Sequence, residues 1–234
     1  MTLEDILSRA RCLLVDFDGP ICSVFAGHPA PVLAGQLLDL IGDRIGTVPP
    51  ELAELTANPL QLLRQVADVG DEDLTRDVAN ACRDAEVVAV ESATPTPGAH
   101  GVLRAAYDVG LPVVIVSNNA SQAVEAYLKI HTLGMFVHGI AARSDDLDPR
   151  LLKPHSFLVE AGLNIAGVGA TRAAFIGDSD TDIEAGRAAG TATIGYANKP
   201  GKHERLTTAG ADSVIDTMHA LIEVIRPVTT RSAM

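Results

Sequence analysis

The chain has 234 residues, of which 47% are apolar, enough for one sizeable core and a smaller accessory region. It carries 30 acidic against 18 basic residues, for a formal charge of -12, so its surface field should repel nucleic acid and anionic membrane surfaces. Only 3% of the residues are aromatic, which leaves few platforms for stacking bases and further argues against a nucleic-acid-binding protein.

Three short apolar runs predict buried strands, and each run ends in a polar residue. In chain order they are Cys12–Val15 before Asp16, Val113–Val116 before Ser117, and Ala173–Ile176 before Gly177 and Asp178. Further strands are predicted at 136–141, 192–196 and 213–215. Between and after the strands, helix start signals lie at Pro97-Gly98, Ser121, Pro154 and Asp180.

The alternation of strands and helices indicates a parallel sheet. We therefore predict an α/β fold, with a Rossmann-like parallel sheet that carries helices on both faces. Ligands of such sheets bind outside the carboxyl ends of the strands. The polar residues that follow the three apolar runs should therefore meet in one crevice, although they lie far apart in the sequence.

The stretch 21–94 has no pattern of a buried strand but contains amphipathic helical segments at Leu60–Val69 and Asp73–Val90. It predicts a small helical cap inserted after the first strand. The chain would return to the core through Thr94–Gly98, a stiff proline-rich linker. The core domain is then expected over 1–20 and 95–226, and the tail 227–234, which lacks periodicity, is expected to be disordered.

Asp16 and Asp18 follow the first predicted strand directly. The alternation of an extended chain puts their carboxylates on the same side of the backbone, where both can act on one substrate. An isolated Asp-x-Asp-Gly is equally typical of a solvated turn. The catalytic interpretation therefore depends on the partners found elsewhere in the chain.

Asp178 and Asp182, four residues apart, lie where another strand runs into a helix, so their carboxylates can face the same point. Magnesium prefers a few carboxylates, several waters and a phosphate oxygen of the substrate. We expect Mg²⁺ to be held by Asp16, Asp18, Asp178 and Asp182. The alternative is that such acids only cap a helix, which is the interpretation we prefer for Asp180.

A phosphate-binding set is expected beside these acids. Ser117 ends the second strand and precedes Asn118 and a helix start, so a hydroxyl and backbone N–H groups can surround a phosphate. Lys153 precedes Pro154, which suits a first helical position, and would direct its ammonium into the same crevice. Each of these features alone is common on protein surfaces.

Taken together and in this order, the four segments resemble the haloacid dehalogenase-like hydrolase superfamily over most of the chain. An insert between the first and second motifs is typical of its branch with a helical cap, which includes phosphoglycolate phosphatase-like and β-phosphoglucomutase-like enzymes. The family's four motifs match, in order, Asp16 with Asp18, Ser117, Lys153, and Asp178 with Asp182.

The resemblance implies a magnesium-dependent phosphatase that acts on a small phosphorylated metabolite. Asp16 would attack phosphorus and form an aspartyl-phosphate, while Asp18 would protonate the leaving oxygen and then activate water. Magnesium, Lys153 and Ser117 would neutralise the charge of the transferring group. A helical cap suggests a small substrate, because a closing cap excludes water and bulky ligands.

Two alternatives stay open. A phosphomutase of the β-phosphoglucomutase type would use the same residues to return the phosphoryl group to a sugar. A non-enzymatic module that binds a phosphometabolite would keep the fold alone, although such a module should have lost a nucleophile or a metal ligand. Asp18 argues against dehalogenation, since a halide needs no proton, and the insert contains no lysine for phosphonate cleavage.

Several positions outside the motifs carry further expectations. Pro20 should restrain the hinge of the cap, and Cys22 is expected to be a small buried residue rather than an oxidation-sensitive thiol. The basic run 199–205 is expected to be a solvated helix start, with attraction of an anion near the crevice as the alternative. The cap residues that are candidates to touch the leaving group are His28, Arg44 and Arg64.

The three scattered cysteines are too few for a disulfide framework. The amino terminus is acidic where a signal peptide needs positive charge, and no apolar run approaches the roughly 18 residues of a membrane span. We therefore expect a cytoplasmic protein without a membrane partner. No feature of the sequence indicates an oligomeric state.

Overall fold

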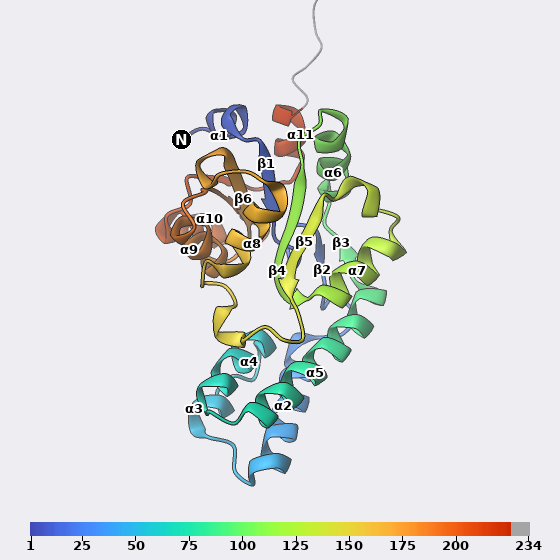
Figure 1. Ribbon diagram of the computed structural model, residues 1–234, viewed down its shortest axis with the longest axis vertical. Helices are drawn as coiled ribbons and strands as arrows, with labels where there is room; N and C mark the ends of the chain where they lie inside the picture. The colour runs from blue at the N-terminus through green and yellow to red at the C-terminus, as the bar shows by residue number, and fades with distance from the viewer. Residues whose placement is uncertain (226–234) are drawn as a thin grey trace, which may run out of the picture.

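The computed structural model of the protein describes residues 1–225 (Figure 1). Its main sheet has six strands, all parallel, in the order β5-β4-β1-β6-β7-β8. The predicted α/β fold with a parallel sheet is therefore confirmed. The strands are β1 (Cys12–Val15), β4 (Val113–Ala120), β5 (Gly139–Arg143), β6 (Ala173–Gly177), β7 (Ala192–Tyr196) and β8 (Ser213–Ile215).

Apolar side chains of the central strands alternate between the two faces of the sheet, as an extended chain requires. In β1, Leu13 and Val15 belong to one buried cluster, and Cys12 and Leu14 to another. The first cluster includes side chains of α1 (Leu3–Arg9), α6 (Ala99–Asp108), α7 (Ser121–Ile130) and α11 (His219–Ile225). The second includes α8 (Phe157–Ala166) and α9 (Asp180–Ala188), and α10 (Lys202–Ala209) packs on α9 and β7.

The chain reverses its direction along the sheet beside β1. From β1 it passes to β4 and β5 on one side, and then to β6, β7 and β8 on the other. A crevice at the carboxyl ends of the strands is expected at such a switch point. The segments that follow β1, β4 and β6 therefore face one another across this crevice.

Three predicted boundaries were wrong. The strand expected at Val113–Val116 is β4, which continues through Ser117 to Ala120 with a register shift in its pairing to β5. The strand expected at 136–141 is β5, which begins at Gly139, because the apolar residues before it form a 3-10 turn at Gly134–Phe136. The helix expected to begin at Pro154 begins at Phe157, where the carbonyl of Ser156 accepts a hydrogen bond from Glu160 N at 2.9 Å. Lys153 therefore precedes a turn and does not lie at a helix start.

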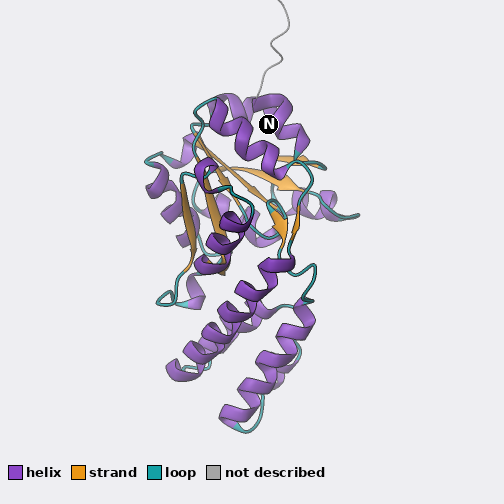
Figure 2. Ribbon diagram, turned by 90° about the vertical axis from the view of Figure 1, so that its right-hand side faces the viewer, coloured by secondary structure: helices purple, strands orange, loops and turns teal. Residues whose placement is uncertain are grey.

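The insert between β1 and α6 is helical, as predicted, and extends from the edge of the sheet where its strands end (Figures 1 and 2). Two of its helices match the predicted segments to within one residue at each end. Its base is a pair of short antiparallel strands, and the second of them occupies part of the segment that was predicted to be a linker. The elements are β2 (Cys22–Ser23), α2 (Ala30–Ile45), α3 (Pro50–Ala53), α4 (Pro59–Asp68), α5 (Glu72–Ala89) and β3 (Thr94–Pro95).

The insert is packed against the core. Its buried residues Leu33, Leu62 and Val78 belong to the same apolar cluster as Leu14 and Val116 of the sheet. Among the described residues, no helix is both long and apolar enough to cross a bilayer. The tail predicted to be disordered, 227–234, lies outside the described residues.

Candidate active site

A pocket of about 390 Å³ lies at the carboxyl ends of β1, β4 and β6, between the sheet and α4. The structure thus brings together every motif residue that the sequence singled out. Arg64 of the insert joins them there. The pocket is lined by Asp16, Asp18, Asn58, Leu60, Gln61, Arg64, Ser117, Asn118, Asn119, Lys153, Asp178, Ser179, Thr181 and Asp182.

The ammonium group of Lys153 lies at the centre of the buried charges. It donates hydrogen bonds to Asp16 Oδ1 at 2.7 Å, to Asp182 Oδ1 at 2.5 Å and to the carbonyl oxygen of Val116 at 3.2 Å. All three donor positions of an ammonium are therefore used. Lys153 is only 3% exposed, so this contact fixes two carboxylates that would otherwise repel each other.

The local electrostatics keep Lys153 charged. Burial alone lowers the pKa of the ammonium, but Asp16 and Asp182 outweigh it and raise that pKa above its ordinary value. Burial and the neighbouring carboxylate of Asp182 raise the pKa of Asp16, while Lys153 opposes the shift. A further cation beside Asp16 would favour the ionised form that a nucleophile requires.

Both carboxylate oxygens of Asp182 accept hydrogen bonds that fix the turn between β6 and α9. Its Oδ2 accepts hydrogen bonds from Asp178 N, Ser179 N and Ser179 Oγ, and its Oδ1 accepts one from Lys153. Ser179 is the N-cap of α9, and Ser179 and Asp182 form a capping box. Asp180, expected to be the cap, is the first residue of the helix and pairs with Arg205.

Asp178 is oriented by two donors from the segment that follows β7. Its Oδ2 accepts hydrogen bonds from Lys202 Nζ at 2.5 Å and from Asn198 Nδ2 at 3.0 Å. Burial raises the pKa of Asp178, and Lys202 counteracts that shift. The basic run 199–205 therefore contacts one pocket residue, Asp178, through Lys202, while Arg205 pairs with Asp180 outside the pocket lining.

The acidic residues fit a magnesium ion. Ligand atoms of Asp16, Asp178 and Asp182 all lie within 4.8 Å of one another. Within the described residues, the hydrogen bonds of Asp16 use Oδ1 and those of Asp178 use Oδ2, which leaves one oxygen of each for a cation. The carbonyl oxygen of the Asn198 side chain is buried without a partner in the same residues, as expected for a group that faces a site completed by water.

Asp18 lies apart from this cluster. Its Oδ1 accepts a hydrogen bond from Val24 N at 2.9 Å, and its carboxyl does not belong to the group of three described above. Burial raises the pKa of Asp18 to about 6, close to the value that suits a general acid and base near neutral pH. This geometry favours proton transfer over the metal-binding role also predicted for this side chain.

Ser117 and Asn118, near the end of β4, also line the pocket. Asn118 clamps the backbone of Lys153, since its Oδ1 accepts from Lys153 N at 2.8 Å and its Nδ2 donates to Lys153 O at 3.1 Å. Ser117 Oγ donates to Asn119 Oδ1 at 3.1 Å. Asn119, which sequence reasoning did not single out, thus orients the hydroxyl expected to bind phosphate.

The three candidate residues of the insert differ in position. Arg64 lines the pocket, and its guanidinium makes no ion pair or hydrogen bond with residues 1–225. Arg44 pairs with Asp77 within the insert, and neither Arg44 nor His28 lines the pocket. Cys22 is fully buried, and burial raises the pKa of its thiol, so it is a packing residue rather than a reactive one.

Comparisons with known proteins agree with this geometry. A model of the haloacid dehalogenase-like hydrolase family matches residues 10–190. Phosphoglycolate phosphatase of Pseudomonas putida is 26% identical over 210 residues, which cover 81% of this chain and 76% of that protein. The phosphoglycolate phosphatase of Pseudomonas savastanoi pv. phaseolicola is 28% identical over 126 residues, 54% of this chain and less than half of the relative, 45%.

Solved structures show the same fold. CbbY from Rhodobacter sphaeroides, determined in complex with phosphate, superimposes with a TM-score of 0.66 at 19% identity, covering 91% of this chain and 96% of that one. The β-phosphoglucomutase of Clostridium difficile gives a TM-score of 0.65 at 16% identity, covering 91% and 93%. At such identities, the likeness shows the fold alone.

The close approach of Gly19 to Asp178 gives a testable prediction. A Cβ atom at Gly19 would lie 2.4 Å from Asp178 Cγ, and the backbone there has a φ of +110°, which disfavours any side chain. Gly19→Ala should displace Asp178 and weaken Mg²⁺ binding about tenfold or more. Calorimetric titration of the folded variant with Mg²⁺ would measure this loss.

Gly46→Ala is the matched control. Gly46 has a φ of +81° at the end of α2, but a Cβ atom there would meet nothing within 4 Å. This substitution should lower thermal stability through backbone strain and leave Mg²⁺ affinity unchanged. Equal Mg²⁺ affinity in the two variants would contradict the role given to Gly19.

Proposed function

The chain belongs to the haloacid dehalogenase-like hydrolase family, and from that premise we propose that it is a magnesium-dependent phosphatase of a small phosphate monoester. The observation that carries the proposal is the Lys153 ammonium held between Asp16 and Asp182, with Asp178 beside them. Its phosphatase relatives support the reaction class.

The proposed reaction has two steps. A carboxylate oxygen of Asp16 attacks phosphorus, the bond from phosphorus to the ester oxygen breaks, and an aspartyl-phosphate forms. Asp18 gives its proton to the departing alcohol. Asp18 then takes a proton from water, whose oxygen attacks the phosphoryl group. The bond from phosphorus to the Asp16 oxygen breaks, so that inorganic phosphate leaves and both carboxyl groups return to their starting states.

The surrounding groups would position and neutralise the phosphoryl group, which supplies most of the catalysis in such transfers. Lys153 would exchange its hydrogen bond to the carbonyl oxygen of Val116 for one phosphoryl oxygen and keep its bond to Asp16, and Ser117 with Asn118 would hold the other phosphoryl oxygens. Asp16 and Asp178 would hold the magnesium ion, oriented by Asp182 and Lys202. When bound, the ion neutralises phosphate charge that so acidic a pocket would otherwise repel.

The insert would select the leaving group, and we propose residues 21–94 as the cap domain. Arg64 is a cation without a partner among the described residues, which favours a leaving group with an anion of its own. Phosphoglycolate, the substrate named for the two Pseudomonas relatives, is a small ester with such a carboxylate. We therefore infer a small phosphorylated acid as the substrate class.

Asp16→Asn should abolish phosphate release, because an amide cannot serve as the nucleophile. Asp18→Asn should lower kcat by about 10²- to 10⁴-fold, the usual contribution of a general acid and base. Colorimetric detection of inorganic phosphate over a panel of phosphorylated metabolites with Mg²⁺ would test both. Turnover by Asp16→Asn at the wild-type rate would refute the nucleophile, and interconversion of sugar phosphates without phosphate release would indicate a mutase.

Arg64→Met should raise KM about tenfold for phosphorylated acids, because a charge-assisted hydrogen bond to the leaving group is lost. The KM for p-nitrophenyl phosphate, which has no second anion, should change little. Arg44→Met is the control, since Arg44 belongs to the same insert but lies outside the pocket. Similar effects of Arg64→Met on both substrates would count against the proposed substrate class.

A further inference from the structure

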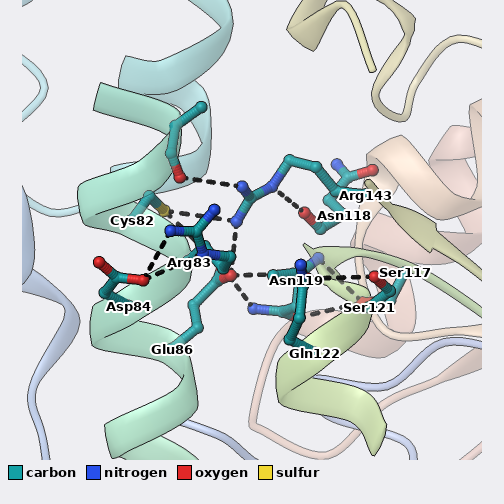
Figure 3. Close-up of polar contacts among 12 residues, drawn as sticks. Cys82, Arg83, Asp84, Glu86, Ser117, Asn118, Asn119, Ser121, Gln122 and Arg143 are labelled. Atoms are coloured by element: carbon teal, nitrogen blue, oxygen red, sulfur yellow. Dashed lines mark hydrogen bonds and ion pairs between the residues drawn. The ribbon is translucent and has the colours of Figure 1, made fainter. Parts of the chain in front are cut away.

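Helix α5 of the insert reaches the irregular end of β4, Ser117–Ala120, where the pairing with β5 shifts register. We refer to this bulged segment as the loop at Ser117–Ala120. The contact is made by one fully buried carboxylate, Glu86 (Figure 3). Glu86 Oε2 accepts a hydrogen bond from Ala120 N at 2.8 Å, and Oε1 accepts one from Asn119 Nδ2 at 3.0 Å. A side chain of the insert therefore satisfies a backbone donor and a side-chain donor of the loop from Ser117 to Ala120.

Arg143, at the end of β5, completes this arrangement. Its guanidinium pairs with Glu86 Oε2 at 2.5 Å, and its Nε donates to the carbonyl oxygen of Asn118 at 3.1 Å. It also donates to Ala79 O of α5 at 3.3 Å. Arg143 is 3% exposed and Glu86 is 0% exposed, so the two charges neutralise each other away from water.

The same contacts continue to the groups expected to bind phosphate. Asn119, held by Glu86, accepts the hydrogen bond of the Ser117 hydroxyl. Asn118, whose carbonyl is held by Arg143, clamps the backbone of Lys153 with its side chain. Both branches of the network therefore end at a side chain of the proposed phosphate site.

A neutral pair suits this position for a physical reason. A lone carboxylate so close to a phosphate site would repel the substrate, whereas a buried ion pair adds no net charge. It still supplies two strong acceptors to the loop and one donor to its carbonyl, and charge-assisted hydrogen bonds are the stronger kind. The pair therefore fixes the loop without raising the negative charge of the pocket.

We propose that Glu86 and Arg143 are positioning residues, through which the insert orders the phosphate-binding loop at Ser117–Ala120. The insert then contributes to the binding of the phosphoryl group as well as to the selection of the leaving group. This inference rests on the proposed function, since it concerns the loop assigned there to phosphate.

The test compares Glu86→Gln with wild type in calorimetric titrations with inorganic phosphate in the presence of Mg²⁺. Glutamine keeps the size of the side chain, but its amide nitrogen faces donors and cannot accept from them. Phosphate affinity should fall about tenfold or more, and hydrogen exchange of the peptide that covers Ser117–Ser121 should accelerate. Unchanged phosphate affinity in folded Glu86→Gln protein would overturn the proposal.

A second variant guards against a loss of folding, because removing one partner of a buried ion pair is strongly destabilising while replacing both by apolar residues often is not. Glu86→Leu/Arg143→Met should remain folded and show the same weakened phosphate binding. Wild-type affinity in this double variant would also overturn the proposal.

Arg83→Gln is the matched control. Arg83 lies on the same helix and pairs with Asp145 of the core at 2.9 Å, but it does not contact the loop at Ser117–Ala120. Its phosphate affinity should stay within about twofold of wild type. A loss as large as that of Glu86→Gln would mean that docking of α5 in general is responsible, against the proposal.

The two proposals fail separately. If wild-type protein binds phosphate but releases none from any ester, the phosphatase is refuted and the binding comparison still tests the loop. If wild-type protein releases phosphate from an ester and Glu86→Gln keeps the wild-type phosphate affinity, the positioning role of Glu86 alone is refuted.

Discussion

The ammonium of Lys153 is the constraint on which the pocket depends. Asp16 and Asp182 are almost fully buried, and like charges at such distances cannot both be ionised without a cation between them. Lys153 supplies that cation through ion pairs with both carboxylates. Lys202 forms an ion pair with the third carboxylate, that of Asp178. Three carboxylates against two ammonium groups still leave the site acidic, and this remaining negative charge fits the divalent cation that we propose.

The sequence predicted this group of residues because the carboxyl ends of parallel strands lie at one edge of the sheet. Apolar runs that end in polar residues identified β1, β4 and β6, and parallel strands bring their carboxyl ends to one edge. Asp16, Ser117 and Asp178 therefore follow from local pattern and fold class alone. Lys153 was also placed correctly in the pocket, although the helix start expected beside it lies three residues further along.

Other parts of the site could not be derived in this way, because they depend on side-chain contacts between distant segments. Glu86 and Arg143 are separated by 57 residues, and Lys202 and Asp178 by 24. In the sequence, Glu86 is one acid on an amphipathic helix, and Lys202 belongs to a run typical of a solvated helix start. Only the docking of α5 and the path of the chain after β7 make these two residues part of the site.

The position of Glu86 changes how the insert should be understood. The two segments that connect the insert to the core pair with each other as β2 and β3. The buried ion pair between Glu86 of α5 and Arg143 of the core is a second attachment. Arg64, in contrast, lies on α4 and faces the pocket. In the function that we propose, one insert therefore combines an anchored side, which holds the end of β4, with a side that would contact the substrate. On this proposal, a change of substrate would be accommodated on α4, while a change on α5 near Glu86 would alter the phosphate site that all substrates share.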